Sequence, residues 1–180
     1  MKIKIKNYFL YSVAYDDQKK AICKIKNHIL SKGQKYIYDS NNRLRYITNI
    51  ENDEIGEKYM DYHKYQIIQT LSDSKKIVGT ANLDYIDKND GTGLKRMLLR
   101  PPLINKLIVY LSNDRKISIY LNRDGSCILK NEQNEAIGKI SGGMLKGYLL
   151  EFHETDDVCL ICAIFVLTRY LDEENNFYIV

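Results

Sequence analysis

The chain has 180 residues, of which 44% are hydrophobic and 28% are charged, a balance typical of one soluble globular domain that can bury a sizeable core. Four cysteines in a chain of this size do not make a disulfide framework. No apolar run reaches the roughly 20 residues that a membrane-spanning helix needs, so no transmembrane segment is expected.

The net charge of +4 is unevenly distributed. Residues 1–35 hold nine Lys and two Asp, a charge of +7, whereas residues 36–180 hold 18 Lys and Arg and 21 Asp and Glu, a charge of −3. A basic N-terminal segment on a mildly acidic body favours phosphate-bearing partners. Solvated strand faces explain the same lysines without any partner.

Lysine alternates with isoleucine over residues 2–6, and this period of two predicts a strand with Ile3 and Ile5 facing the core. Residues 8–15 continue the apolar pattern and are expected to prolong that strand. No small-residue cleavage site follows, so we expect no signal peptide and a cytoplasmic protein.

The next segment, residues 16–33, fits two structures. Asp17 is a suitable cap for a helix that Gly33 would end. Residues 23–26 alternate in the manner of a strand instead. The pattern alone leaves both possibilities open.

Between residues 35 and 152, short apolar runs alternate with turn sequences rich in Asp, Asn, Ser and Gly, which stabilise turns. Turns that recur about every ten residues are typical of a β-sandwich or β-barrel. One long connection, residues 84–106, interrupts the pattern. The expected strands are 36–38, 44–47, 65–71, 77–83, 107–111, 117–121, 127–130, 136–140 and 147–152.

Ten consecutive apolar residues, starting at Val158, follow the paired acids Asp156 and Asp157. This run is about half the length of a membrane span, and it is too uniformly apolar for a helix with one wet face. Aspartate also favours helix N-termini. We therefore predict a helix over residues 157–171 that is buried on every side by a surrounding sheet. The tail, residues 176–180, is expected to add a last strand.

The closing part of the chain combines an Ala-Ile-Gly-Lys-Ile strand at 136–140, a Tyr-Leu-Leu-Glu-Phe strand at 148–152, the paired acids and the apolar helix. Earlier, residues 36–39 and 45–47 flank a polar turn. Together these features resemble the tubby C-terminal-like superfamily, which includes LURP-one-related proteins and phospholipid scramblases. The resemblance covers residues 21–172 in order. It implies a mainly β fold, a closed antiparallel β-barrel of about twelve strands around a buried C-terminal hydrophobic α-helix.

The resemblance favours a strand over residues 21–30 and treats residues 1–180 as a single barrel domain, with residues 1–20 as an N-terminal extension. The family includes phosphoinositide binders and proposed lipid movers, but no ligand-binding residue carries over position by position. The chain departs from related bacterial sequences at Thr168 and Arg169, where those usually have an acid. The long connection also matches no part of the family pattern.

Cys159 and Cys162 have the CxxC spacing of redox and zinc sites, which need thiolates in a polar or electropositive setting. Because they lie in an apolar run with no second CxxC, we interpret them as reduced core thiols. Glu154, Asp156 and Asp157 resemble the acid cluster that precedes the helix in scramblases, where calcium binding is implied. Helix capping explains these acids equally well. We expect no metal site and no cofactor.

Residues 91–96 are rich in glycine, and the basic residues Lys95, Arg96 and Arg100 lie in or just after this segment. Backbone N–H groups together with Lys and Arg can cradle a phosphate. The glycine spacing is neither that of a P-loop nor that of a dinucleotide fingerprint. Long connections in compact domains are often functional. Lys95, Arg96 and Arg100 are therefore the predicted phosphate- or lipid-binding residues, with a plain surface loop as the alternative.

No Ser-His-Asp, Cys-His or paired-carboxylate arrangement stands out, so we expect no enzyme. The expected function is a non-enzymatic binding module for acidic phospholipid or phosphoinositide head groups, in a cytoplasmic protein attached peripherally to a membrane surface. A protein-interaction or scaffold domain without a lipid ligand is the first alternative. A nucleic-acid-binding module that uses the same lysines is the second, although the tyrosine-rich segment 59–65 has no RNA-binding signature.

Overall fold

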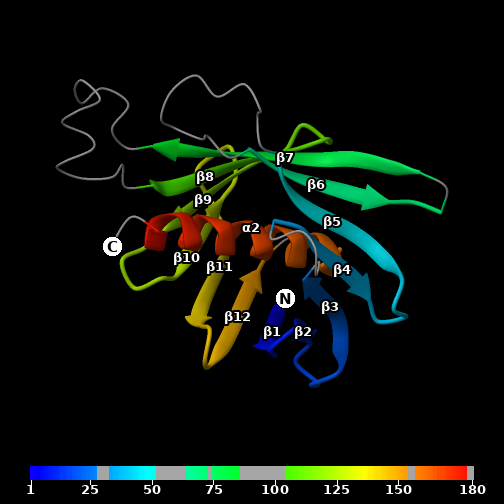
Figure 1. Cartoon of the computed structure of the whole chain (residues 1–180). Helices are drawn as coiled ribbons and strands as arrows, with labels where there is room; N and C mark the ends of the chain where they lie inside the picture. Colours follow the sequence, from blue (N-terminus) through cyan, green and yellow to red (C-terminus); the bar gives the residue numbers. More distant parts are fainter. Residues whose placement is uncertain (28–32, 52–63, 73, 86–103, 154–156, 178–180) are drawn as a thin grey trace.

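The computed structural model describes residues 1–27, 33–51, 64–72, 74–85, 104–153 and 157–177 (Figure 1). Within these residues, twelve antiparallel strands close into one barrel, and the chain ends in a helix. The predicted fold class is therefore confirmed. The elements are β1 (Lys2–Asn7), β2 (Tyr11–Tyr15), β3 (Ala21–Asn27), β4 (Lys35–Asp39), β5 (Leu44–Glu51), β6 (Lys64–Thr70), β7 (Lys75–Tyr85), β8 (Ile104–Leu111), β9 (Lys116–Leu121), β10 (Cys127–Lys130), β11 (Ala136–Gly143), β12 (Gly147–Phe152) and α2 (Val158–Phe177).

Each strand pairs with its neighbours along the chain, and the first strand also pairs with the last. In the closing pair, Ile3 of β1 lies opposite Leu150 of β12. This pairing removes both sheet edges, which would otherwise expose a row of unpaired backbone groups. Every strand expected between residues 36 and 152 is present. β7 and β8 extend into the expected connection, whose residues 86–103 lie outside the described part of the chain.

Residues 8–15 do not prolong the first strand, so that prediction is wrong. The chain reverses after β1, where the N–H of Tyr8 donates to the carbonyl of Tyr11 at 2.8 Å, and β2 pairs back on β1. An unbroken strand over residues 2–15 would be much longer than the usual length of about five or six residues. The reversal lets Ala14 face the core beside β1. It also places two barrel strands within residues 1–20, the segment treated above as an extension.

The ambiguous segment after β2 contains the strand β3, so the helix alternative is wrong for residues 21–27. Cys23 and Ile25 point inward and are buried. In the preceding turn, the N–H of Lys20 donates to the carboxylate of Asp16 at 2.8 Å. β3 hydrogen-bonds to β2 on one side and to β4 on the other. A helix in this place would leave the facing backbone groups of both neighbours without partners.

The helix α2 packs inside the barrel against β3, β4, β5, β8 and β9 (Figure 1). Residues 161–168 are all buried, as the uniformly apolar run predicted. The helix begins at Val158 because Asp157 is its N-cap. Oδ1 of Asp157 accepts hydrogen bonds from the N–H groups of Cys159 at 2.9 Å and Leu160 at 3.1 Å.

The helix continues to Phe177, beyond its predicted end at residue 171. The predicted strand over residues 176–180 is therefore wrong for its first two residues, and the other three are not among those described. Arg169 and Asp172, one turn apart, form an ion pair at 2.8 Å that supports the helical continuation. In the described part of the chain, no helix combines the length and the apolar character that crossing a membrane requires.

Candidate functional site

The predicted phosphate-binding residues Lys95, Arg96 and Arg100 fall outside the described residues. The loop that carries them stays a prediction. A different group of basic side chains, from the first three strands, comes together on the outside of the barrel.

The outer surface of β1, β2 and β3 carries five lysines, Lys2, Lys4, Lys6, Lys24 and Lys26. Side chains alternate along a strand, so the isoleucines between these lysines are buried while the lysines face outward. β2 pairs with both β1 and β3. The two groups of lysines therefore share one continuous surface, which we call the basic face.

Tyrosine rings lie between the lysines of the basic face. Three ammonium groups lie over a ring: Lys6 is 5.7 Å from the ring centroid of Tyr15, Lys24 is 4.2 Å from that of Tyr11, and Lys26 is 4.6 Å from that of Tyr38. A cation over an aromatic ring is attracted by the negative charge on its face. The rings also cover the apolar lysine stems. These three lysines are thus held against the surface rather than extended freely into solvent.

The basic face has little internal compensation of its charge. No Asp or Glu points outward from β1, β2 or β3, all of whose residues are described. At its border, Lys2 forms an ion pair with Glu151 of β12 at 3.2 Å. Both side chains are well exposed, and such pairs contribute little. The surface therefore carries a positive potential that attracts anions.

Lys24 and Lys26 are the site residues that the sequence did not reveal. Their segment fits a helix as well as a strand, and a helix would have placed them away from the first strand. The detectable signal is the alternation over residues 23–26, in which Lys24, Ile25 and Lys26 repeat the lysine–isoleucine pattern of residues 2–6. Two such segments indicate two basic strand faces, but they do not say that the faces adjoin.

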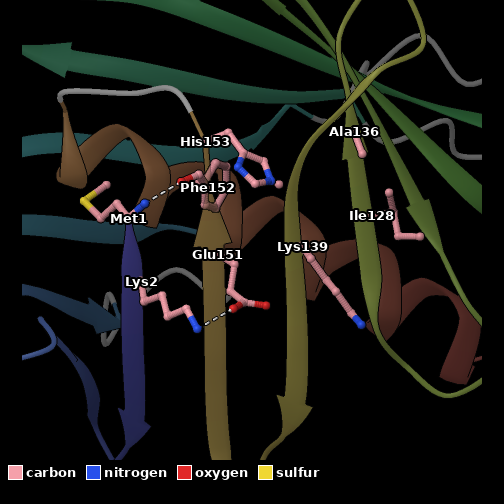
Figure 2. A pocket seen from close by; sticks show the side chains of 9 residues that line it. Met1, Lys2, Ile128, Ala136, Lys139, Glu151, Phe152 and His153 are labelled. Atoms are coloured by element: carbon pink, nitrogen blue, oxygen red, sulfur yellow. Dashed lines mark hydrogen bonds and ion pairs between the residues drawn. The ribbon is translucent and has the colours of Figure 1, made fainter.

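A hollow of about 370 Å³ lies beside the basic face, against β1, β12, β11 and β10 (Figure 2). Its lining is formed by Met1, Lys2, Ile128, Ala136, Gly138, Lys139, Glu151, Phe152 and His153. Several polar groups here are already paired, because Lys2 binds Glu151 and the backbone nitrogen of Met1 donates to the carbonyl of Phe152 at 2.6 Å. Ligand sites need polar groups that converge on the ligand. The basic face is therefore the stronger candidate.

The CxxC pair lies in the core. Cys159 and Cys162 are buried and free, as are Cys23 of β3 and Cys127 of β10. A hydrogen bond with Cys23, and then burial, raise the pKa of Cys159. Burial raises the pKa of Cys127 to about 12. Thiols with a raised pKa stay protonated, and it is the thiolate that attacks or binds metal. This agrees with the interpretation of these cysteines as core thiols.

Of the three acids before the helix, Asp157 is described and acts as the helix cap, whereas Glu154 and Asp156 are outside the described ranges. Oδ2 of Asp157 accepts a hydrogen bond from the hydroxyl of Tyr46 at 2.7 Å and lies 3.9 Å from Nη2 of Arg45. Burial, and then this hydrogen bond, raise the pKa of Tyr46. The residues that the structure describes contain no group of three or more His, Cys, Asp or Glu suited to a metal ion.

The tyrosine-rich segment contributes to the core. Tyr65 is fully buried and stacks on Tyr170 of α2, with ring centroids 5.2 Å apart. A buried ring of this kind is not available to stack on a nucleic-acid base. Lys64, next to it, is exposed, and residues 59–63 lie outside the described part.

Comparison with known proteins bears on the fold. No family model matches the chain, and no curated protein matches it. The chain is similar to the X-ray structure of a protein from Arabidopsis thaliana, AT5G01750, with a TM-score of 0.55 and 11% sequence identity over 95% of this chain and 90% of that chain. At this level of identity, the likeness shows a related fold and nothing more.

Proposed function

We propose that this protein is a non-enzymatic module that binds acidic phospholipid or phosphoinositide head groups at a membrane surface, through the basic face. The observation that carries the proposal is the five lysines on one surface, with no outward-facing acid on the same strands. The related fold and the resemblance of residues 136–152 and the following helix support membership of the tubby C-terminal-like superfamily. The protein would then act in the cytoplasm and attach to the membrane peripherally.

The composition of the basic face suits a bilayer surface. Each lysine near an anionic membrane contributes about 1 kcal/mol, so five lysines contribute about 5 kcal/mol before screening. Tyrosine favours the head-group region, because its ring is apolar and its hydroxyl is polar. Exposed charges are screened over roughly 10 Å at 0.1 M salt. Binding should therefore require acidic lipid and weaken as salt is added.

Replacing Lys4, Lys6 and Lys24 together by glutamate should abolish binding to acidic vesicles. Phosphatidylcholine vesicles that contain phosphatidylserine should sediment the wild type at low salt, and pure phosphatidylcholine vesicles should not. The triple variant should lose this binding, because the attracting potential is reversed. Lys6 and Lys24 also lose a ring contact, so the unfolding free energy should fall by about 0.5–1 kcal/mol for each of these two changes and hardly at all for the exposed Lys4.

The matched control replaces Lys75, Lys76 and Arg123, which are exposed on other parts of the barrel, by glutamate. The change in net charge is the same, so a similar loss of binding would mean that total charge, not the basic face, is responsible. A third variant replaces the predicted loop residues by glutamate. If only this loop variant loses binding, the basic face is the wrong site. If the wild type ignores acidic vesicles at every salt concentration, the lipid proposal fails and a protein-interaction or scaffold role takes its place.

A further inference from the structure

Two hairpin turns of the barrel expose large apolar side chains. The turn between β1 and β2 exposes 96% of Phe9 and 63% of Leu10. The turn between β11 and β12 exposes 75% of Met144, and Leu145 is completely exposed. None of these four side chains can contribute much to the core, since water surrounds them on most sides. We call these four residues the apolar tip.

The two turns lie side by side, because β1 is hydrogen-bonded to both β2 and β12. At the end of β1, the side-chain amide of Asn7 donates to the carbonyl of Met144 at 3.1 Å and ties one turn to the other. Figure 1 shows both hairpins, one blue and one yellow to orange, near each other at the lower edge of the molecule. The apolar tip is therefore one patch built from two turns.

Turn chemistry does not account for these residues. Other described turns use residues that stabilise reversals, among them Asn42, Asp114 and Asn134, each with a positive φ. In the two neighbouring turns of the apolar tip, apolar residues occupy the central positions, although Gly142 and Gly147, each with a positive φ, flank the β11–β12 turn. Large apolar side chains that gather on a surface mark a site of association.

The surroundings of the apolar tip indicate what it meets. Lys6, at the end of the basic face, lies on one side, and the exposed Lys146 directly follows Leu145. Tyr8 stacks on Tyr11 between the tip and the basic face, with ring centroids 4.9 Å apart. An apolar patch with tyrosines and lysines behind it matches the layers of an acidic bilayer, from acyl chains to head-group phosphates.

We propose that the apolar tip enters the boundary between head groups and acyl chains of a bilayer that carries acidic lipid. This inference rests on the proposed membrane function and deepens it. The basic face supplies the attraction that salt screens, and the apolar tip supplies a contact that salt does not screen. The tip also sets the orientation, with the β1–β2 and β11–β12 turns toward the membrane.

The absence of tryptophan from the chain allows a direct test of insertion. Phe9→Trp and Leu145→Trp each place a single fluorescent side chain in the tip. With vesicles of phosphatidylcholine and phosphatidylserine, the emission of both should shift to shorter wavelength, and brominated acyl chains should quench it. Ile77→Trp is the matched control, because Ile77 is half exposed on β7, on the opposite side of the barrel from β1. Its emission should neither shift nor be quenched.

A second variant changes Leu10 and Leu145 to serine and leaves the lysines in place. Vesicle binding at moderate salt should weaken about tenfold or more, because two apolar side chains no longer leave water. Thermal stability should stay unchanged, because both side chains are exposed. If the tryptophan variants bind vesicles as the wild type does but their emission is not quenched, the inference about the apolar tip is overturned. The proposed role of the basic face would be unaffected.

The remaining outcomes separate the two proposals. If the tip tryptophans insert but the glutamate variant of the basic face still binds, insertion of the apolar tip is supported and lipid binding through the basic face is contradicted. If the wild type binds no acidic vesicle, both fail. The tip could instead join two copies of this chain. Sedimentation velocity of the lipid-free protein would then show a dimer that the serine variant dissociates, and this result would also overturn the inference.

Discussion

At the scale of single residues, a few buried polar side chains locate the helix inside the barrel. The hydroxyl of Tyr170 donates to the carbonyl of Gly33 at 2.7 Å and lies 3.3 Å from Oγ1 of Thr48. Thr48 is fully buried. A buried polar group without a partner costs about 1–3 kcal/mol, so these contacts favour one rotation and depth of the helix over others. Apolar packing alone is non-directional and would discriminate less.

Cys127 gives a prediction about pH. Burial raises the pKa of its thiol in the folded protein from the ordinary 9.0 to about 12, so the folded state keeps a proton that the unfolded chain releases. The stabilisation is complete below pH 9.0 and is lost as the pH rises from there toward 12. In this window, the unfolding free energy should fall with a limiting slope of about 1.4 kcal/mol per pH unit from this group.

Urea unfolding of the wild type and of Cys127→Ala, measured over this pH range, tests the prediction. Lysine and tyrosine side chains titrate there too, so the difference between the two proteins is the informative quantity. The alanine variant should be less stable at neutral pH, because it leaves a cavity, and its stability should fall less steeply at alkaline pH. Parallel pH profiles would show that the thiol is ionised as easily in the folded state as in the unfolded one.

At the scale of elements, α2 is the part of the core that strands from several sides of the barrel share. It packs against β3, β4, β5, β8 and β9, which are not all neighbours in the barrel, so it couples distant parts of the sheet. Ring contacts strengthen this coupling, as Phe165 meets Tyr148 of β12 with centroids 5.0 Å apart. Arg169 lies over the same tyrosine, 4.9 Å from its ring centroid. We expect the barrel not to form without the helix.

Ile164→Asp should prevent folding. Ile164 is 1% exposed, and a carboxylate in its place would be buried without a partner. Ile164→Val is the matched control and should cost only about 0.5–1.5 kcal/mol, since it removes one methylene. Circular dichroism and cooperative thermal unfolding report the outcome. A soluble Ile164→Asp protein with a cooperative transition would show that α2 is not the centre of the core.

At the scale of the whole molecule, the barrel depends on the pairing of its first and last strands. β1 and β12 come from opposite ends of the chain, yet Lys2 pairs with Glu151 and Ile5 with Tyr148. Closing so long a loop has an entropic cost. Closure offsets this cost because it leaves no sheet edge with unpaired backbone groups and encloses the helix. The same closure brings the two apolar turns together beside the basic face, so the apolar tip exists only in the closed barrel.

Gly147→Ala should weaken the closure. Gly147 has a φ of +79°, and a Cβ there would meet the carbonyl oxygen of Ile5 on β1. The backbone strain at this φ and the close contact with Ile5 both disfavour a side chain, so we expect a loss of about 2 kcal/mol or more in unfolding free energy. Gly125→Ala separates them, because Gly125 has a φ of +78° with nothing within 4 Å of its Cβ position. Equal losses in urea unfolding would mean that backbone strain, and not the contact with β1, sets the cost.

The sequence by itself determined most of the elements of this protein. Alternation over residues 2–6 identified a strand with buried isoleucines, and polar turn residues divided the strands that follow. The apolar run from Val158 identified a buried helix. These features follow from local physics, because side-chain period, turn propensity and helix capping each act over a few residues. The reversal at residues 8–10 escaped because Tyr, Phe and Leu are not turn formers.

Only the tertiary structure decided what the elements make together. Whether residues 16–33 held a strand depended on neighbours that needed hydrogen-bond partners, and the helix end at Phe177 was equally hidden from the local pattern. The basic face requires β2 to lie between β1 and β3, and the apolar tip requires β1 to lie between β2 and β12. A local residue pattern does not say which strands will be neighbours in the barrel. The strand register is the one that lets all twelve described strands close around one helix. It therefore depends on contacts throughout the barrel and not on any one local pattern.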